Sequence, residues 1–127
     1  MGRLQLRPTD AELAILRVLW ERGPCTVRQV HEALATRETG YTTTLKLMQI
    51  MADKGLVTRN ETSRTHVYSA MAGEAQTQQQ LVQDLVDRAF GGSAATLVLR
   101  ALSAEGTSAS ELREIRKLID DHREKKS

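Results

Sequence analysis

The chain is 127 residues long, with 40% hydrophobic, 27% charged and only 3% aromatic residues, and it carries a formal net charge of +2. This composition is ordinary for a soluble globular protein and predicts one compact domain, or one small domain with an appendage. Because Cys25 is the only cysteine, an internal disulfide and a cysteine-rich metal site are both excluded.

The first seven residues lack an apolar signal-peptide core, and no run approaches the ~18 apolar residues needed to span a bilayer. We therefore expect a soluble, cytoplasmic protein without membrane insertion. Residues 1–72 carry ten Lys and Arg against seven Asp and Glu, whereas residues 73–127 carry eight against nine. The basic first part fits a polyanionic partner, although chance asymmetry accounts for the charges equally well.

Two helices are expected at the start of the chain. Each begins with a capping box, formed by a Thr and by a Glu or Gln three residues later. The side chain of each of the two residues accepts a hydrogen bond from the backbone amide of the other. Helical spacing of apolar residues then predicts helices over 9–21 and 27–35, separated by Gly23 and Pro24 and followed by a polar loop over 36–40. The apolar faces consist of Leu13, Leu16 and Trp20 in the first helix and of Val27, Val30 and Leu34 in the second.

A third helix is predicted over 42–54 and ends at Gly55. Apolar spacing predicts that one of its faces packs into the core, while a separate polar stripe runs along the other side. The core face comprises Thr44, Leu47, Met48 and Met51, and the polar stripe comprises Thr42, Lys46, Gln49 and Asp53.

Two short strands, 56–59 and 65–69, follow the third helix and are joined by a polar loop over 60–64. A third strand of the same sheet has room near Cys25, just before the second helix. The pattern of a lone cysteine favours a small buried hydrophobic residue there, with a redox switch as the alternative.

The second half of the chain, residues 73–127, is predicted to be helical. Helices are expected over 76–90, from Ser93 to about Leu102, and from Ser108 until a charged tail begins at His122; Gly91 and Gly92 break the first from the second. Three short helices bury little surface alone, so we expect them to complete a core against a second copy; packing onto the first domain is the alternative. The expected dimer-interface residues are Leu81, Leu85, Phe90, Leu97, Leu112, Ile115 and Ile119.

The predicted fold is therefore mainly α with a small β-hairpin: a winged helix-turn-helix domain over 1–72 and a helical dimerisation domain over 73–127. In winged helices the third helix enters the major groove of DNA and the hairpin follows the phosphate backbone. The polar stripe has the side chains that such reading needs, although a merely solvated helix face is the alternative. The candidate DNA-binding residues are Tyr41, Thr42, Thr43, Lys46, Gln49, Arg59, Arg64 and His66.

Nothing in the sequence indicates an enzyme, a metal site or a cofactor. A Gly-rich phosphate loop, a His-Glu-x-x-His pattern and a nucleophile elbow are all missing. His31, His66 and His122 lie far apart in the sequence and differ in local character, so we expect surface or wing residues rather than ligands.

Short motifs in a specific order extend over nearly the whole chain. They are Thr9-Asp10-Ala11-Glu12-Leu13, Leu16, Leu19-Trp20, Thr26-Val27-Arg28-Gln29-Val30, Gly40-Tyr41-Thr42-Thr43, Lys54-Gly55-Leu56-Val57, Tyr68, Phe90-Gly91-Gly92-Ser93, Leu97-Val98-Leu99 and Leu112-Arg113-Glu114-Ile115. In this order the motifs resemble the penicillinase-repressor family (BlaI/MecI type).

The resemblance implies a transcriptional repressor that binds a pseudo-palindromic double-stranded operator as a homodimer. It also implies a membrane-bound sensor linked to metallopeptidase activity, which ends repression by cleavage in the dimerisation region. The family's Asn-Phe cleavage pair is replaced here by Arg100-Ala101, and Ile50 stands where family members often carry a basic residue. The related copper-responsive branch senses metal through C-terminal Cys-x-Cys pairs, which this chain lacks.

Two further functions remain open at the level of sequence. One is a ligand-sensing winged-helix regulator of the multidrug type, although Phe90 is the only aromatic residue after residue 72 that could line its pocket. The other is a winged helix that binds proteins instead of DNA.

Overall fold

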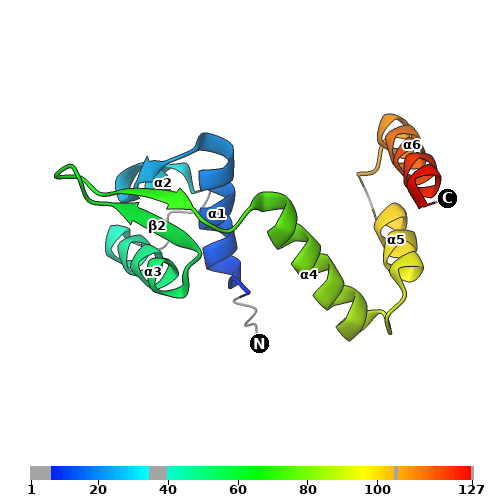
Figure 1. Cartoon of the computed structure of the whole chain (residues 1–127), viewed down its shortest axis with the longest axis horizontal. Helices are drawn as coiled ribbons and strands as arrows, with labels where there is room; N and C mark the ends of the chain where they lie inside the picture. Colours follow the sequence, from blue (N-terminus) through cyan, green and yellow to red (C-terminus); the bar gives the residue numbers. More distant parts are fainter. Residues whose placement is uncertain (1–6, 35–39, 105, 127) are drawn as a thin grey trace. The chain divides into compact units, whose positions relative to one another are not determined.

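The computed structural model describes residues 7–34, 40–104 and 106–126 (Figure 1). The chain divides into two compact units, residues 1–82 and 83–127, and the boundary falls within one helix. In chain order the elements are α1 (Asp10–Arg22), β1 (Cys25–Thr26), α2 (Val27–Ala33), α3 (Tyr41–Lys54), β2 (Val57–Asn60), β3 (Val67–Ala70), α4 (Glu74–Ala89), α5 (Ala94–Ser103) and α6 (Ala109–Lys126).

Both predicted capping boxes are present. The Glu12 amide donates to Thr9 Oγ1 at 3.2 Å, and the Thr9 amide donates to Glu12 Oε1 at 2.9 Å. Thr26 and Gln29 form the same pair of bonds at the start of α2, at 2.9 and 3.1 Å. The helix α2 ends at Ala33, and most of the predicted loop over 36–40 lies outside the described residues.

The buried face of α1 differs from the predicted one. Ile15, Leu16 and Leu19 are buried, whereas Leu13 and Trp20 are only half-buried. The reason is that α1 packs against α2, α3 and β3 at once, so its buried surface is wider than a single stripe and is centred elsewhere. The half-buried Trp20 makes a hydrogen bond with the edge of its ring: the indole Nε1 donates to the carbonyl oxygen of Ala72 at 2.8 Å.

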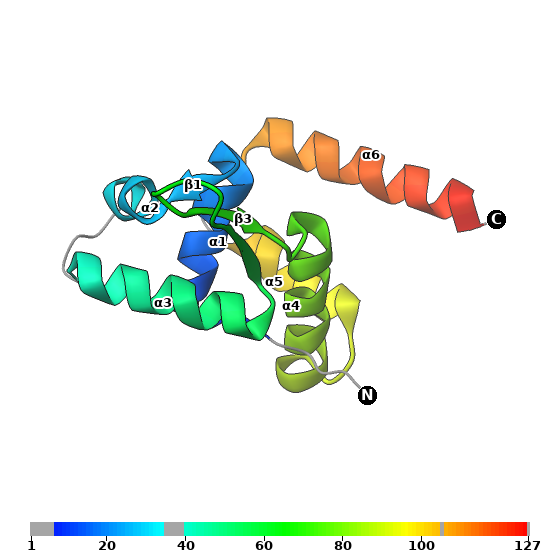
Figure 2. The ribbon, with the colours of Figure 1, turned by 60° about the vertical axis from the view of Figure 1, so that its left-hand side comes forward.

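The third helix, α3, closely follows its prediction. Thr44, Met48 and Met51 are buried, and Leu47 is half-buried. Gly55 ends the helix in the left-handed conformation, with φ +84°, which side chains other than glycine rarely adopt. Figure 2 shows α3 lying alongside the rest of the first unit.

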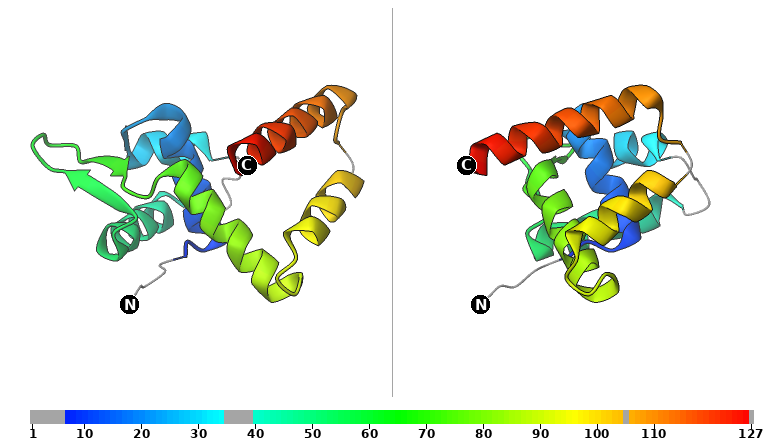
Figure 3. Two further views of the ribbon diagram at one scale, coloured as in Figure 1. Left: turned by 45° about the vertical axis from the view of Figure 1, so that its right-hand side comes forward. Right: turned by 90° about the vertical axis from the view of Figure 1, so that its right-hand side faces the viewer.

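The three strands form an antiparallel sheet in the order β1-β3-β2, so the expected third strand is present. Tyr68 of β3 lies between Cys25 of β1 and Arg59 of β2 in the register. Both wing strands begin later than predicted. For β2 the reason is that Leu56 belongs to the turn after α3, where its amide donates to Met51 O at 2.9 Å; β3 begins at Val67, and the carbonyl of Thr65 before it accepts from Ser63 Oγ within the loop. The β2–β3 hairpin extends away from α1, α2 and α3 (Figure 3).

One apolar core joins these elements, and Cys25 is buried in it as expected. Its buried members are Ile15, Leu16, Val18, Leu19, Cys25, Val27, Val30, Met48, Met51, Leu56, Val57 and Tyr68. The elements from α1 to β3 thus form the predicted winged helix, with three helices and a hairpin around a single core.

In the remainder of the chain the predicted helix break at Gly91 and Gly92 is confirmed, since both have positive φ, +57° and +86°. Ser93 caps α5, and its Oγ accepts from the Thr96 amide at 3.1 Å. The expectation that α6 dissolves at His122 is wrong, because the helix continues to Lys126. Arg, Glu and Lys are good helix formers, and cations near a helix C-terminus interact favourably with its dipole.

The helices α5 and α6 lie wholly within the described residues, and neither contains a buried residue. Among the helices described over 7–34, 40–104 and 106–126, none is long and apolar enough to cross a membrane.

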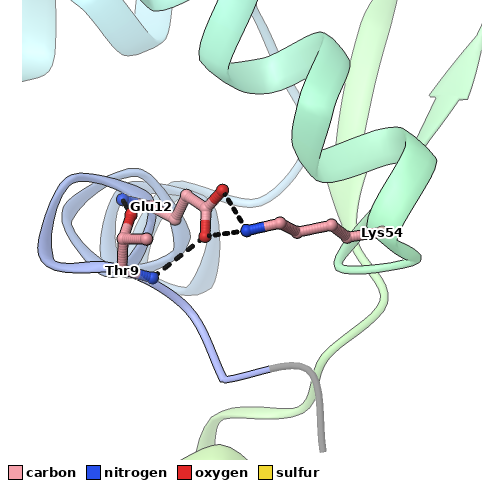
Figure 4. A network of polar contacts seen from close by, with 3 residues as sticks. All are labelled: Thr9, Glu12 and Lys54. Atoms are coloured by element: carbon pink, nitrogen blue, oxygen red, sulfur yellow. Dashed lines mark hydrogen bonds and ion pairs between the residues drawn. The ribbon is translucent and has the colours of Figure 1, made fainter. Parts of the chain in front are cut away.

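A buried ion pair connects α1 to the end of α3 (Figure 4). Glu12 is only 2% exposed, and Lys54 Nζ donates to its two carboxylate oxygens at 3.0 and 2.9 Å. The amide of Thr9 supplies a further bond to the same carboxylate. Burial raises the pKa of Glu12, but the bonds from Lys54 and Thr9 outweigh burial, so the pKa lies below the usual glutamate value.

Lys54→Ala should destabilise the fold by about 2 kcal/mol, because it leaves the buried carboxylate of Glu12 without its cation. The free energy of unfolding, measured by urea denaturation at pH 7, tests this. Lys46→Ala on the exposed face of the same helix is the matched control, and it should change stability by less than about 0.5 kcal/mol.

The same pair predicts a pH dependence. Since the pKa of Glu12 is lowered on folding, its charged form contributes stability above the ordinary value of 4.5, and the contribution is lost as the pH falls through the lowered pKa. The difference between wild type and Lys54→Ala should therefore shrink below pH 4.5. A difference that stays constant down to acid unfolding would contradict the assignment.

Candidate nucleic-acid interface

A groove of about 510 Å³ lies between α2, α3 and the hairpin of the first unit. Its lining comes from β1, α2, α3, β2, β3 and the loop of the hairpin, and consists of Thr26, Val27, Arg28, Tyr41, Leu45, Gln49, Arg59, Arg64, Thr65, His66 and Tyr68. Among these described lining residues three are arginines and none is Asp or Glu. The groove is therefore suited to an anionic partner.

All five candidate residues on α3 are exposed: Tyr41, Thr42, Thr43, Lys46 and Gln49. Their orientation follows from the opposite side of the helix, where Thr44, Met48 and Met51 are buried. Tyr41 and Gln49 line the groove itself. The polar stripe predicted from spacing is thus a real exposed surface, held in place by the buried side of the same helix.

Tyr41 is held between two residues of α2. The guanidinium of Arg28 lies 5.2 Å from the centroid of the Tyr41 ring, and His31 meets that ring edge-on, with centroids 6.0 Å apart. The Nδ1 atom of His31 also forms a hydrogen bond of 2.9 Å with the buried Thr44 Oγ1. These contacts connect α2 to the first turn of α3 and fix where the tyrosine points.

Arg28 is a candidate that the sequence interpretation did not select. It is exposed and lines the groove, but it belongs to the second helix rather than to the polar stripe or the hairpin. The only signal in the sequence was a basic residue in the first turn of α2, between the capping residues Thr26 and Gln29; its contact with Tyr41 at the start of α3 appears only in the structure.

The hairpin supplies Arg59, Arg64 and His66 to the groove, as the sequence suggested. Arg64 and His66 lie in the loop and are exposed. Arg59 is already engaged: its Nε donates to Glu61 Oε2 at 2.6 Å. A hydrogen bond with the Tyr68 hydroxyl and the Glu61 carboxylate together raise the pKa of Arg59 above its usual value.

The expected dimer-interface residues fall into two groups. Leu85, Leu112 and Ile119 are exposed, with Leu112 at 44% and Ile119 at 50%. The remaining four, Leu81, Phe90, Leu97 and Ile115, are half-buried within the single chain. Arg100 and Ala101, which stand at the family's cleavage position, are exposed on α5.

Comparison with known proteins gives a consistent result. A family model described as penicillinase repressor matches residues 8–121. The transcriptional regulator BlaI of Mycobacterium tuberculosis is 40% identical over 82 residues, which cover 63% of this chain and 59% of that protein. The penicillinase repressor of Bacillus licheniformis is 23% identical over 119 residues, 93% of both chains.

The chain therefore spans less than two thirds of the mycobacterial relative and nearly all of the Bacillus one. Both relatives are regulators, in agreement with the expectation that the chain is not an enzyme. Among solved structures, BpsR of Bordetella bronchiseptica matches 94% of this chain and 78% of its own, with a TM-score of 0.48 and 17% identity.

Arg28→Ala should weaken binding to a polyanion, because it removes one of the three guanidinium groups that line the groove. The variant should elute from heparin at lower salt than wild type, and the slope of log affinity against log salt should fall by about one. Arg17→Ala, an exposed arginine on α1 outside the groove, is the control. Equal shifts for both variants would mean that the groove is not the polyanion surface.

Proposed function

The chain belongs to the penicillinase repressor family, and we propose on that premise that it is a transcriptional repressor that binds a double-stranded operator as a homodimer. The observation that carries the proposal is the arginine-lined groove beside the exposed polar face of α3. Helix and hairpin present the two kinds of contact that DNA recognition needs, one to bases and one to phosphates.

In the proposed complex, α3 enters the major groove. Thr42 and Thr43 lie in its first turn, where the helix N-terminus favours a phosphate, and the Thr43 methyl can pack on thymine. Lys46 reaches guanine acceptors or a phosphate one turn further on, and Gln49 pairs with adenine. The burial of Thr44 and Met48 supports this arrangement, because it fixes the rotation of the helix.

The hairpin and the start of α3 contact the phosphate backbone. Arg64 and His66 are exposed in the wing loop, and Tyr41 offers a hydroxyl at the mouth of the groove. Such contacts fix the position of the protein on DNA and carry little sequence information.

Homodimer formation is supported by the apolar residues that the single chain leaves exposed in its helical part. Among them are Leu85, Leu112, Leu118 and Ile119. Exposed apolar side chains in such number on adjoining helices mark an interaction surface. A two-fold dimer also matches a pseudo-palindromic operator, since each winged helix then reads one half-site.

The family resemblance further supports a cytoplasmic protein whose repression is ended by proteolysis, initiated by a membrane-bound sensor with metallopeptidase activity. Arg100-Ala101 is the proposed position of cleavage, and its exposure on α5 is compatible with this role. Cutting there would separate α6 from the rest of the dimerisation region.

DNA reading predicts different effects for residues on the helix and on the wing. After the preferred sequence is selected from a random duplex pool, Lys46→Ala and Thr43→Ala should each weaken binding to it by about 1–3 kcal/mol if they contact bases. Arg64→Ala should weaken binding to every sequence and reduce the salt slope by about one. Gel shifts over a salt series provide both quantities, and unchanged affinity in all three variants would refute the proposed function.

Dimer formation is tested in α6. Leu112→Asp and Ile119→Asp would each bury an unpaired charge in the proposed interface, at a cost of several kcal/mol, so sedimentation should show a monomer. Ser110→Asp adds the same charge to the first turn of that helix, where an acid is favourable, and should remain dimeric. If the two interface variants sediment as dimers, the helices pack in another way.

A further inference from the structure

The three arginines of the groove differ in what they already bind. Arg28 lies over the ring of Tyr41, and no ion pair of Arg64 is found within the described residues. Arg59 instead forms an ion pair with Glu61, in which Nε and Oε2 are 2.6 Å apart. A groove suited to phosphate therefore holds one cation whose partner is a carboxylate of the same hairpin.

The local backbone explains why this pair forms. Arg59 is the third residue of β2 and Glu61 directly follows the last one, Asn60, so the two side chains are only two positions apart where the strand ends. Asn60, between them, accepts from both the amide and the hydroxyl of Thr62, at 2.9 and 2.8 Å. These bonds form a tight turn directly at Glu61 and keep its carboxylate close to Arg59.

Arg59 also has a buried neighbour on the adjacent strand. Its cross-strand partner in the sheet is the buried Tyr68, whose hydroxyl helps to raise the pKa of Arg59. Glu61 is 53% exposed, so it is the outer of the two partners. Without the Glu61 contact, Arg59 would remain in the groove lining beside Tyr68, its partner in the strand register.

We propose that Glu61 is an internal anion that occupies Arg59 in the free protein, competes with DNA phosphate for it, and so limits how strongly the wing binds DNA. The inference rests on the proposed DNA-binding function and deepens it. A carboxylate and a phosphate present similar acceptors to a guanidinium, so both are ligands for the same side of Arg59. An exposed ion pair is weak enough for a phosphate to displace, but the released Glu61 carboxylate then repels the nearby backbone.

The test compares Glu61→Gln with wild type by titrating labelled duplex DNA at several salt concentrations. The variant should bind roughly two- to fivefold more tightly at low salt, and its salt slope should be steeper by up to about one. Asp121→Asn on α6 makes the same change in net charge outside the groove and should match wild type. Glu61→Ala is a second variant that removes the carboxylate without an amide in its place, and it should behave like Glu61→Gln.

A double-mutant cycle attributes the gain to Arg59. Arg59→Gln should weaken binding less in wild type, where Glu61 already occupies the side chain, than in the Glu61→Gln background, where it should abolish most of the gain. Wild-type affinity in both Glu61 variants, or a gain that survives Arg59→Gln, would overturn the inference while leaving the proposed function intact. Failure of wild type to bind duplex DNA at all would instead refute the proposed function, and the inference with it.

Discussion

The buried carboxylate of Glu12 is the constraint on which the rest of the first unit depends. A charge with 2% exposure is tolerable only when all its partners are in place, and the cation among them comes from the far end of α3. The pair therefore fixes the C-terminal end of α3 against the first turn of α1. At its other end α3 is held by the His31–Thr44 hydrogen bond and by the contact of Tyr41 with Arg28. A helix fixed at both ends presents its polar face in one orientation, which precise base reading requires.

The order of the elements, the capped helix starts and the helix ends marked by glycine were predictable from the sequence, because each depends on residues a few positions apart. The capping residue Thr9, the helix-ending Gly55 and the core positions of α3 are local signals of this kind. What the sequence did not reveal depends on residues brought together from afar. Glu12 was recognised as a capping residue, but its second role requires Lys54, 42 positions away. The same holds for the candidate site, where the exposed stripe was predicted but the place of Arg28 above Tyr41 required the packing of α2 on α3.

The groove shows how a fold can supply positive charge without a uniformly basic surface. The whole chain carries a net charge of only +2, yet three guanidinium groups from α2, β2 and the wing loop converge on one depression. Arg28 lies over the ring of Tyr41, Arg59 is paired with the Glu61 carboxylate, and no ion pair of Arg64 is found within the described residues. Because a restrained side chain loses less conformational entropy on binding, Arg28 begins closer to its bound geometry than Arg64 does, whereas in the proposed competition Arg59 has to exchange the Glu61 carboxylate for a phosphate.

The helical part of the chain has the opposite character, since its surface is rich in apolar residues that a single copy does not cover. In the proposed dimer, covering them would hold two winged helices on one duplex, and the second half-site would then be bound at a high effective concentration. Weak DNA binding by one winged helix would become strong binding by two, without any new contact in the groove. It follows that an event confined to α5 or α6 would lower operator affinity while every DNA-contacting residue stays unchanged. Regulation and recognition would then act on separate surfaces of the same chain, coupled only through the dimer equilibrium.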